Sequence, residues 1–346
     1  MDVLVDPHSD YASFVDLLDN TYRRGGGNIL GPTVAFAAGG NGGNVALTTS
    51  ALDTETFFLG TTSDFGKYLM EFFYGKYGVN VVFSTAGILA SSMILEFRKK
   101  DQKINVMSSF SGSVADFGPE KLTESQWSVL LESQAVAITN FQNAMLLQLA
   151  DSIISKIEKD TIVSIDFSDL TPHKARIPEI YTFLKRRPGH PELIVGNENE
   201  MIILAGGLKE FRPLDDPMKR LDAAAEATEY TSENFPGTIF CLHTGHFSSI
   251  YENGICLASA PAFSLPVINR VTGAGDAWHG GLLVAIIDVQ RPIRDNIRPA
   301  QWSDHLTFAN AVAGFWVENG RPGNREDIWK FMRTHTRQEK YLLPTK

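Results

Sequence analysis

Short runs of apolar and β-branched residues alternate along this chain with segments long enough to form helices. The runs lie at residues 56–59, 135–138, 162–165, 193–195 and 238–242. Strands that alternate with helices form βαβ units, so the pattern predicts an α/β fold around a mostly parallel sheet. Residues 146–159 fit one crossover helix, because apolar residues recur there at helical spacing and lead directly into the run at 162.

Two segments depart from this alternation. Residues 88–107 read as strand, charged turn and strand, which is typical of a hairpin. Residues 17–36 are irregular and glycine-rich and end in a strand-like run. We expect a single domain over residues 1–346, in which residues 17–36 and 88–110 form a small sheet that acts as a lid. An edge extension of the main sheet is the alternative.

Charge and cysteine content exclude several classes of protein. The 346 residues include 31 Lys and Arg against 40 Asp and Glu, a formal charge of −9. Nucleic-acid affinity depends on clustered basic residues, so we expect no nucleic-acid partner. Cys241 and Cys256 are too few for a disulfide framework. With no run of about 18 apolar residues and no secretory pattern at the start, we expect a cytoplasmic protein with small-molecule partners and no membrane contact.

The strongest chemical signal is the segment VTGAGDAWHGG at residues 271–281, which precedes the apolar run LLVAII. Small residues at 273–275 allow a tight turn that points several N–H groups into one concavity at the start of a buried helix, which favours an anion. The spacing fits neither the Walker pattern nor the dinucleotide GxGxxG. Asp276, in the first turn, could take a proton from an attacking hydroxyl; a plain N-cap is the alternative.

A second glycine-rich turn, GGNGGN at residues 39–44, also precedes an apolar helix. Its two amide side chains, Asn41 and Asn44, can both donate to and accept from hydroxyl groups. Glycine turns are common, but two of them far apart in one α/β chain point to a shared site.

These motifs resemble those of the ribokinase-like (PfkB) carbohydrate kinase family. The GGNGGN run is similar to the family's GGxxxN motif, SDFG at 63–66 to its DxFG, NENE at 197–200 to its NxxE and VTGAGDAWHGG to its GAGD motif. The four matches occur in the family's order over nearly the whole chain. The resemblance implies a three-layer α/β/α fold with a mostly parallel central sheet and a small β-sheet lid.

The resemblance also implies roles for individual residues near the phosphoryl group and the substrate. Asp276 would be the general base, and the turn formed by Gly273, Ala274 and Gly275 would be the anion hole. Substrate hydroxyls would be held by four residues: Asp16, Gly40, Asn41 and Asn44. For Asp16, a surface position in the segment DLLDN is the alternative.

The cofactors implied by the resemblance are ATP and Mg²⁺. Asn197 and Glu200 would orient the hydrated Mg²⁺ on the nucleotide phosphates, with no direct protein ligand to the metal. Thr244 and Gly245 would line the nucleotide site. Asn310 would lie near the adenine, although an amide on a buried helix can also serve packing alone. In the family an acidic residue and Thr precede the GAGD turn, where a monovalent cation binds; Arg270 and Val271 stand here, which makes potassium activation doubtful.

Together these observations predict an ATP-dependent carbohydrate kinase that phosphorylates a hydroxyl of a sugar or sugar-like molecule. Two alternatives remain. A nucleoside kinase of the same family could stack the base on Phe141 or Trp278, although core packing explains each of these residues equally well. A catalytically silent sugar- or nucleotide-binding protein could also use the same scaffold. The resemblance further suggests a homodimer formed through the lid sheets.

Overall fold

The computed structural model describes residues 2–37, 39–99, 102–158, 160–186, 192–209, 211, 217–288, 299–338 and 341. Its largest sheet has six strands in the order β12-β11-β10-β9-β8-β7. The strands are β7 (Ala135–Thr139), β8 (Ile162–Asp166), β9 (Glu192–Asn197), β10 (Ile239–His243), β11 (Phe247–Glu252) and β12 (Ile255–Pro261). Strands β7 to β10 run parallel, and β11 and β12 extend the sheet antiparallel. The mostly parallel sheet expected from the sequence is confirmed.

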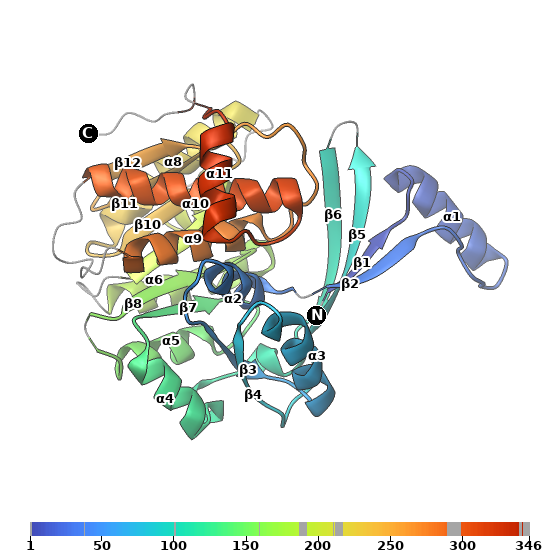
Figure 1. Ribbon diagram of the computed structural model, residues 1–346, viewed down its shortest axis with the longest axis horizontal. Helices are drawn as coiled ribbons and strands as arrows, with labels where there is room; N and C mark the ends of the chain where they lie inside the picture. The colour runs from blue at the N-terminus through green and yellow to red at the C-terminus, as the bar shows by residue number, and fades with distance from the viewer. Residues whose placement is uncertain are drawn as a thin grey trace.

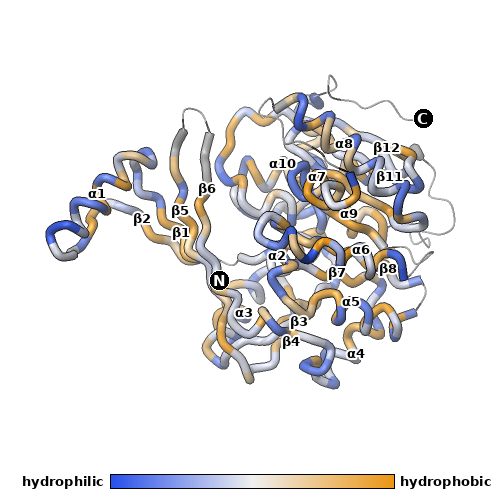
Figure 2. The backbone as a smooth tube through the Cα atoms, turned by 180° about the vertical axis from the view of Figure 1, so that it is seen from behind, coloured by the Kyte–Doolittle hydropathy of each residue, from blue (hydrophilic) through white to orange (hydrophobic). Residues whose placement is uncertain are grey.

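Helices cover both faces of this sheet, which makes three layers (Figure 1). On one face lie α5 (Leu146–Ile154), α6 (Ile177–Lys185), α7 (Glu198–Ala205) and α8 (Pro217–Asn234). On the other lie α9 (Ala274–Asp288), α10 (Pro299–Asn319) and α11 (Arg325–Thr334), together with α2 (Asn41–Ala51). Alternate residues of a strand face opposite layers: Ile194 packs into the first layer, while Leu193 and Val195 pack against the second. Figure 2 shows the hydrophobic runs along α7 and α9 that these contacts bury.

Two further strands, β3 (Phe57–Thr61) and β4 (Asn80–Ser84), pair in parallel as a separate sheet. The helix α3 (Asp64–Gly75) connects them, and Ser63 caps it by accepting a hydrogen bond from the Gly66 N–H at 3.1 Å. Helix α4 (Glu124–Glu132) precedes β7, and short 3₁₀ turns occupy three other segments: Gly112–Asp116, Pro119–Lys121 and Thr171–Arg176.

A four-stranded sheet stands to one side of the main body (Figure 1). Its order is β2-β1-β5-β6, with β1 (Asp2–Asp6), β2 (Thr33–Ala37), β5 (Ser91–Lys99) and β6 (Gln102–Phe110). Strands β5 and β6 form the hairpin expected near residues 88–107. The lid function of this sheet, and the assignment of the whole chain to one domain, remain predictions.

The expectation that residues 17–36 are irregular was wrong for their first part. Helix α1 spans Tyr11–Arg23, and Asp10 caps it by accepting from the Ser13 N–H at 2.9 Å. Phe14 is buried against Phe97 of β5, with ring centroids 5.8 Å apart. The N-cap and this apolar contact, rather than the neighbouring glycines, determine the local structure.

Two expectations about the chain as a whole can be compared with the described residues. Cys241 and Cys256 are both buried and form no disulfide bond, as expected for small core residues. Within the described segments, none of the helices combines the length and the apolar character that a membrane crossing requires.

Candidate active site

The site forms where the first turns of α2 and α9 come together. Gly40 precedes α2 with φ at 86°, and Gly273 precedes α9 with φ at 87°, a left-handed conformation that favours glycine. The two helices pack closely, since a Cβ atom added to Gly280 would lie 3.0 Å from the side chain of Thr48. The glycine turns at 39–44 and 271–276, far apart in sequence, therefore share one site.

A network of amide side chains holds Asp276. Asn41 Nδ2 donates to Asp276 Oδ1 at 2.9 Å, and Asn44 Nδ2 donates to Asp276 Oδ2 at 2.8 Å. Asn140, which directly follows β7, donates to Asn41 Oδ1 at 3.2 Å and has φ at 78°. Each carboxylate oxygen therefore has its own donor, and the orientation of the carboxylate is fixed from two sides. Asn140 was not singled out from the sequence, where it is an ordinary residue after a strand.

The surroundings of Asp276 make it a stronger base than a free aspartate. Burial raises the pKa of Asp276 to about 6, against the opposing effect of the hydrogen bonds from Asn44 and Asn41. The charge of Asp2 raises the pKa further, and that of Arg270 lowers it. At neutral pH the carboxylate is ionised yet close to its pKa, which suits a general base.

The first turn of α9 offers fewer free amides than the sequence suggested. The Ala274 N–H donates to the Val271 carbonyl at 3.1 Å, so it closes the turn instead of pointing into the site. Ala277 is the first residue to donate within the helix, to Gly273 at 2.9 Å. The N–H groups of Gly275 and Asp276 lie in the first turn and have no acceptor within the helix. The expectation that the Ala274 N–H forms part of the anion hole therefore does not hold.

A cavity of about 1230 Å³ opens in front of Asp276. Gly40, Asn41, Asn44, Asn140, Gly273 and Asp276 all line it. Ser92 of β5 and Met107 and Ser109 of β6 line it from the side of the small sheet. The small sheet thus faces the site.

Asp16 does not reach this cavity. It lies exposed on α1, beyond the small sheet, because residues 2–6 form a strand of that sheet and residues 11–23 form the helix that follows. Asp2 is instead buried, with only 5% of its surface exposed, and it lines the cavity. Its charge raises the pKa of Asp276. Burial raises the pKa of Asp2, as expected for a carboxyl group that is shielded from solvent.

Asn197 and Glu200 form a capping box at the start of α7. Asn197 Oδ1 accepts from the Glu200 N–H at 3.1 Å, and Glu200 Oε2 accepts from the Asn197 N–H at 2.8 Å. Burial raises the pKa of Glu200 to about 7. The pKa of Asp166, at the end of β8, also lies well above its usual value. Burial is the main cause, and the charges of Glu200 and Asp276 raise this pKa further. Carboxyl groups therefore gather at the carboxyl ends of β8 and β9, beside α9.

This donor set fits a hydrated Mg²⁺. No group of three or more Asp, Glu, His or Cys side chains among the described residues is arranged to ligate a metal directly. Mg²⁺ commonly keeps several waters and binds mainly through substrate phosphates, which requires only nearby negative charge. Asp166 and Glu200 can supply that charge, because a cation beside them would oppose the effects that raise their pKa values and would favour the ionised carboxylates.

The other residues expected at the nucleotide site differ in their exposure. Thr244 Oγ1 donates to the Phe247 carbonyl at 2.8 Å and shapes the turn between β10 and β11. Gly245, in the same turn, faces open space, since a Cβ atom there would meet nothing within 4 Å.

Asn310 is buried, and its side chain is fully engaged in the core. It donates to the carbonyls of Ala260 and Pro261, both at 3.1 Å, and accepts from Trp278 at 2.9 Å. Asn310 therefore joins three core elements and is not placed to contact an adenine.

Arg270 occupies the position before the GAGD turn. Its guanidinium lies 5.1 Å from the centre of the Trp316 ring, and Trp316 Nε1 donates to the Thr272 carbonyl at 2.9 Å. Among the described residues, the Nε and Nη2 atoms of Arg270 are buried without a hydrogen-bond partner. The side chain places a fixed positive charge beside the turn, and this charge lowers the pKa of Asp276.

Comparison with known families supports the same interpretation. Residues 10–328 match the family described as pfkB family carbohydrate kinase. The chain belongs to this family. The pfkB family comprises phosphotransferases of sugars and nucleosides, so the chain falls in a family of small-molecule kinases.

Several solved structures share the fold of this chain. Ribokinase from Giardia lamblia has a TM-score of 0.69 at 15% identity, with 96% of this chain and 95% of that chain covered. Arabidopsis thaliana ribokinase, complexed with ribose and ATP, has a TM-score of 0.65 at 17% identity, with 96% and 95% covered. A Burkholderia thailandensis nucleoside kinase in complex with inosine has a TM-score of 0.62 at 14% identity, with 99% and 97% covered. At these identities the likeness concerns the fold alone. A search of curated proteins found no match.

Phe141 and Trp278 lie in the core of this pfkB chain. The sequence had offered both as possible stacking partners for a nucleobase. Phe141 has no exposed surface, and Trp278 is 2% exposed. Neither side chain lines the cavity in front of Asp276. Of the two interpretations of these residues, stacking and core packing, their burial favours packing.

Proposed function

We propose that this chain is an ATP-dependent phosphotransferase that phosphorylates a primary hydroxyl of a sugar or sugar-like molecule. The observation that carries the proposal is the position of Asp276. Its carboxylate is buried at the meeting point of two helix N-termini, is oriented by Asn41 and Asn44, and faces a large cavity.

In the proposed reaction the substrate hydroxyl gives its proton to Asp276 while its oxygen attacks the γ-phosphorus of ATP. The bond from the γ-phosphorus to the bridging oxygen breaks, and ADP leaves with the electron pair. A general base contributes a factor of about 10² to 10⁴ in rate. The N–H groups of Gly275 and Asp276, at the positive end of α9, would stabilise negative charge on the transferred group.

Mg²⁺, when bound with the nucleotide, would neutralise charge on the phosphates. Glu200 and Asp166 would hold its waters, and Asn197 would keep Glu200 in place through the capping box. Thr244 and Gly245 would border the nucleotide. Asn310 has no part in this proposal because its amide is engaged in the core.

The polar groups around Asp276 suit a ligand with several hydroxyls. Asn44 Oδ1 is buried and has no hydrogen-bond partner among the described residues, which makes it an acceptor for a substrate hydroxyl. Asn41 and Asp2 offer further acceptors along the same cavity. We assign to Asp2 the hydroxyl-binding role that the sequence had suggested for Asp16. Closure of the small sheet over the bound sugar would exclude water and limit ATP hydrolysis.

The outward face of the small sheet supports the proposal of a homodimer. Strand register places Val34 and Phe36 of β2 on one face with Met93 of β5 and Val106 of β6, and all four are exposed. Their exposed fractions of 47–61% form an apolar surface on the side opposite the cavity. Exposed apolar surfaces of this kind commonly mark protein–protein interfaces.

A substrate panel tests the proposal. ADP formation is measured in a coupled assay with ribose, fructose, 2-keto-3-deoxygluconate, adenosine, inosine and cytidine, and thermal stabilisation is measured with the same ligands. We expect ADP formation with at least one of the sugars. ADP formation with nucleosides alone would instead indicate a nucleoside kinase. Stabilisation by ligands without any ADP formation would indicate a silent binding protein and contradict the proposal.

A further inference from the structure

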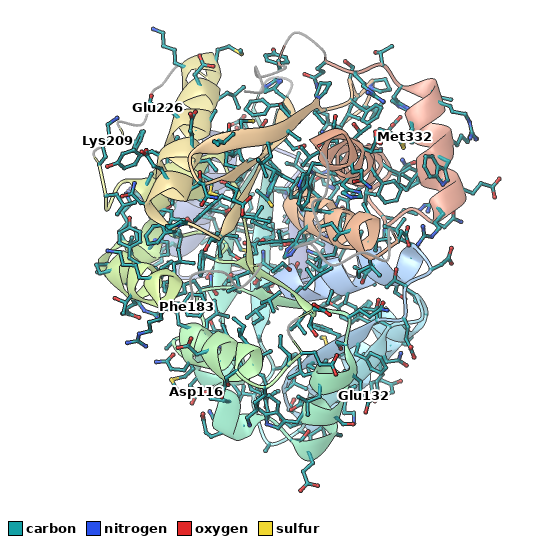
Figure 3. All side chains as sticks on the ribbon, turned by 90° about the vertical axis from the view of Figure 1, so that its left-hand side faces the viewer. Asp116, Glu132, Phe183, Lys209, Glu226 and Met332 are labelled. Carbon is teal, nitrogen blue, oxygen red and sulfur yellow. The ribbon has the colours of Figure 1, made fainter. Side chains whose placement is uncertain are left out.

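The cavity in front of Asp276 carries charge of one sign only. Five acidic side chains line it: Asp2, Glu55, Glu132, Asp169 and Asp276. Glu132, at the end of α4, is labelled in Figure 3. No Lys, Arg or His stands among the described residues that line the cavity. An anionic ligand therefore meets no opposite charge on this part of the cavity wall.

Two arginines lie close to residues of the cavity without lining it. The guanidinium of Arg270 lies 5.1 Å from the centre of the Trp316 ring, and its Nε and Nη2 atoms are buried. Arg176 pairs with Glu179 at 3.1 Å and donates to the Phe141 carbonyl at 3.3 Å. Since neither arginine lines the cavity, an anionic substrate would not reach either guanidinium.

The cavity also offers acceptors that require a donor on the ligand. Asn41 and Asn44 each use Nδ2 to donate to Asp276. Asn44 Oδ1, in contrast, is buried with no hydrogen-bond partner among the described residues. The carboxyl groups of Asp2 and Asp169 offer further acceptor oxygens. A hydroxyl or an ammonium group supplies donors for these atoms, whereas an ionised carboxylate or a phosphate dianion brings only acceptors.

A second polar atom without a partner lies just after β8. Ser168 lines the cavity, and its Oγ atom is buried with no hydrogen-bond partner in the described part of the chain. Its φ of 59° lies in the left-handed region, which serine rarely adopts, and its N–H donates to Asp166 Oδ1 at 2.7 Å. The hydroxyl can exchange hydrogen bonds with a sugar hydroxyl. As a single neutral group, it does not offset the charge of the five carboxyl groups.

The remaining polar groups near the small sheet are uncharged. Ser92 of β5 and Ser109 of β6 line the cavity with their hydroxyl oxygens 3.0 Å apart, and Met107 lines it as well. Gln142, which follows β7, also lines it and accepts from the Ser111 hydroxyl at 3.2 Å. Hydroxyl and amide groups of this kind suit a ligand with several hydroxyls and no anionic group.

An anionic substituent would also weaken the proposed base. Burial and the charge of Asp2 already raise the pKa of Asp276. A further negative charge in the cavity would raise this pKa again and leave less ionised carboxylate at neutral pH. Mg²⁺ offsets the charge of the ATP phosphates, whereas a sugar phosphate or a sugar acid brings no such cation.

We propose that the substrate is an uncharged sugar or an amino sugar, and that the acidic cavity excludes sugar phosphates and sugar acids. Juxtaposed like charges discriminate strongly against a wrong ligand, and the described wall of the cavity holds no cation that compensates for them. The inference rests on the proposed transfer of a phosphoryl group to a sugar, because it names the class of that sugar.

Probes that differ in charge test the proposal. Ribose, fructose, glucose and glucosamine are compared with fructose 1-phosphate, fructose 6-phosphate, gluconate and 2-keto-3-deoxygluconate, by ADP formation and by thermal stabilisation. Each anionic probe keeps a primary hydroxyl, so the acceptor group is present in all of them. We expect kcat/KM for the best neutral or amino sugar to exceed that for every anionic probe at least about tenfold. A smaller difference, or a preference for an anionic probe, would overturn the proposal.

The two assays separate failure of this inference from failure of the proposed function. Phosphorylation of anionic sugars alone would overturn the inference and leave the proposed sugar kinase standing. Stabilisation by neutral or amino sugars but not by anionic probes, without ADP formation, would contradict the proposed function and support the selectivity. No response to any neutral or amino sugar in either assay would overturn both.

A charge introduced into the cavity tests the cause of the selectivity. Gln142→Lys adds a positive charge, and Gln142→Met is the matched control, since both changes remove the contact with Ser111. We expect Gln142→Lys to reduce the preference for the best neutral sugar over the best anionic probe at least about fivefold. Gln142→Met should leave this preference within about twofold. An unchanged preference in Gln142→Lys, or an equal change in both variants, would overturn the role of charge.

Discussion

Asn44 Nδ2 donates to Asp276 Oδ2 at 2.8 Å, although 232 residues separate the two in the sequence. This contact joins the glycine turn near the start of the chain to the glycine turn of α9. It holds a buried carboxylate in one orientation and partly offsets the effect of burial on its pKa. The proposed phosphoryl transfer depends on this pairing.

The rate should follow the ionisation of Asp276. A base must be unprotonated to accept a proton, so kcat/KM should rise with pH, with an apparent pKa of about 6, and level off above it. A pH–rate profile with the best sugar of the panel measures this. A rate that stays constant from about pH 5 to pH 8 would show that no group with this pKa controls the step.

Removing the Asn44 donor should move that profile. Asn44→Ala deletes a hydrogen bond that lowers the pKa of Asp276. The apparent pKa of the pH–rate profile should therefore rise by about 1 pH unit. The loss of kcat/KM should therefore be greater at pH 6 than at pH 8. Asn319→Ala is the matched control: it removes an amide that donates to the Phe315 carbonyl on α10, away from Asp276, and it should leave the profile unchanged. An equal loss at both pH values would indicate that Asn44 acts on Asp276 in some other way.

The elements that form the candidate site could be predicted from the sequence because their signals are local. The apolar runs of β7 to β10 are buried on both faces, which leaves a clear pattern in the sequence. The turns before α2 and α9 require glycine at Gly40 and Gly273, where φ is positive. The pairing of the two turns follows from the family order of the motifs rather than from either turn alone.

Features that depend on tertiary placement could not be predicted in this way. The family resemblance implied a substrate role for Asp16, yet residues 2–6 join the small sheet and leave Asp16 on an exposed helix. Asn140 acts through Asn41, a contact across 99 residues that no local pattern reveals. The Ala274 amide is used within its own turn, which depends on backbone geometry that the motif does not specify.

Asp2 and Asp16 should differ sharply when each is replaced by Asn. Asp2 is buried at the cavity, so Asp2→Asn should raise the KM for the sugar by about tenfold, as for loss of a charged hydrogen-bond acceptor. Asp16 is exposed on α1, so Asp16→Asn should change KM less than about twofold. Steady-state kinetics on the two variants make the comparison. A larger increase in KM for Asp16→Asn than for Asp2→Asn would indicate that Asp16 binds the substrate, as the sequence suggested.

Replacing Asp276 should also stabilise the protein. A carboxyl group whose pKa is raised by folding destabilises the native state wherever the unfolded chain is ionised. This penalty grows from about pH 4 to about pH 6 and is constant above that range. Asp276→Asn should therefore raise the free energy of unfolding by up to about 3 kcal/mol at pH 8 and by little at pH 3. Chemical denaturation at both pH values measures the difference, with the exposed Asp19→Asn as control. A loss of stability at pH 8 would show that the ionised carboxylate is favourable in the fold.

The activity of Asp276→Asn tests the central claim most directly. With a sugar that supports ADP formation by the unaltered chain, single-turnover transfer and ATP binding are measured on the same preparation. We predict that transfer falls by about 10² to 10⁴, while the Kd for ATP changes by less than about threefold. Transfer within about tenfold of the unaltered chain, with ATP bound equally well, would contradict the role of Asp276 as the base.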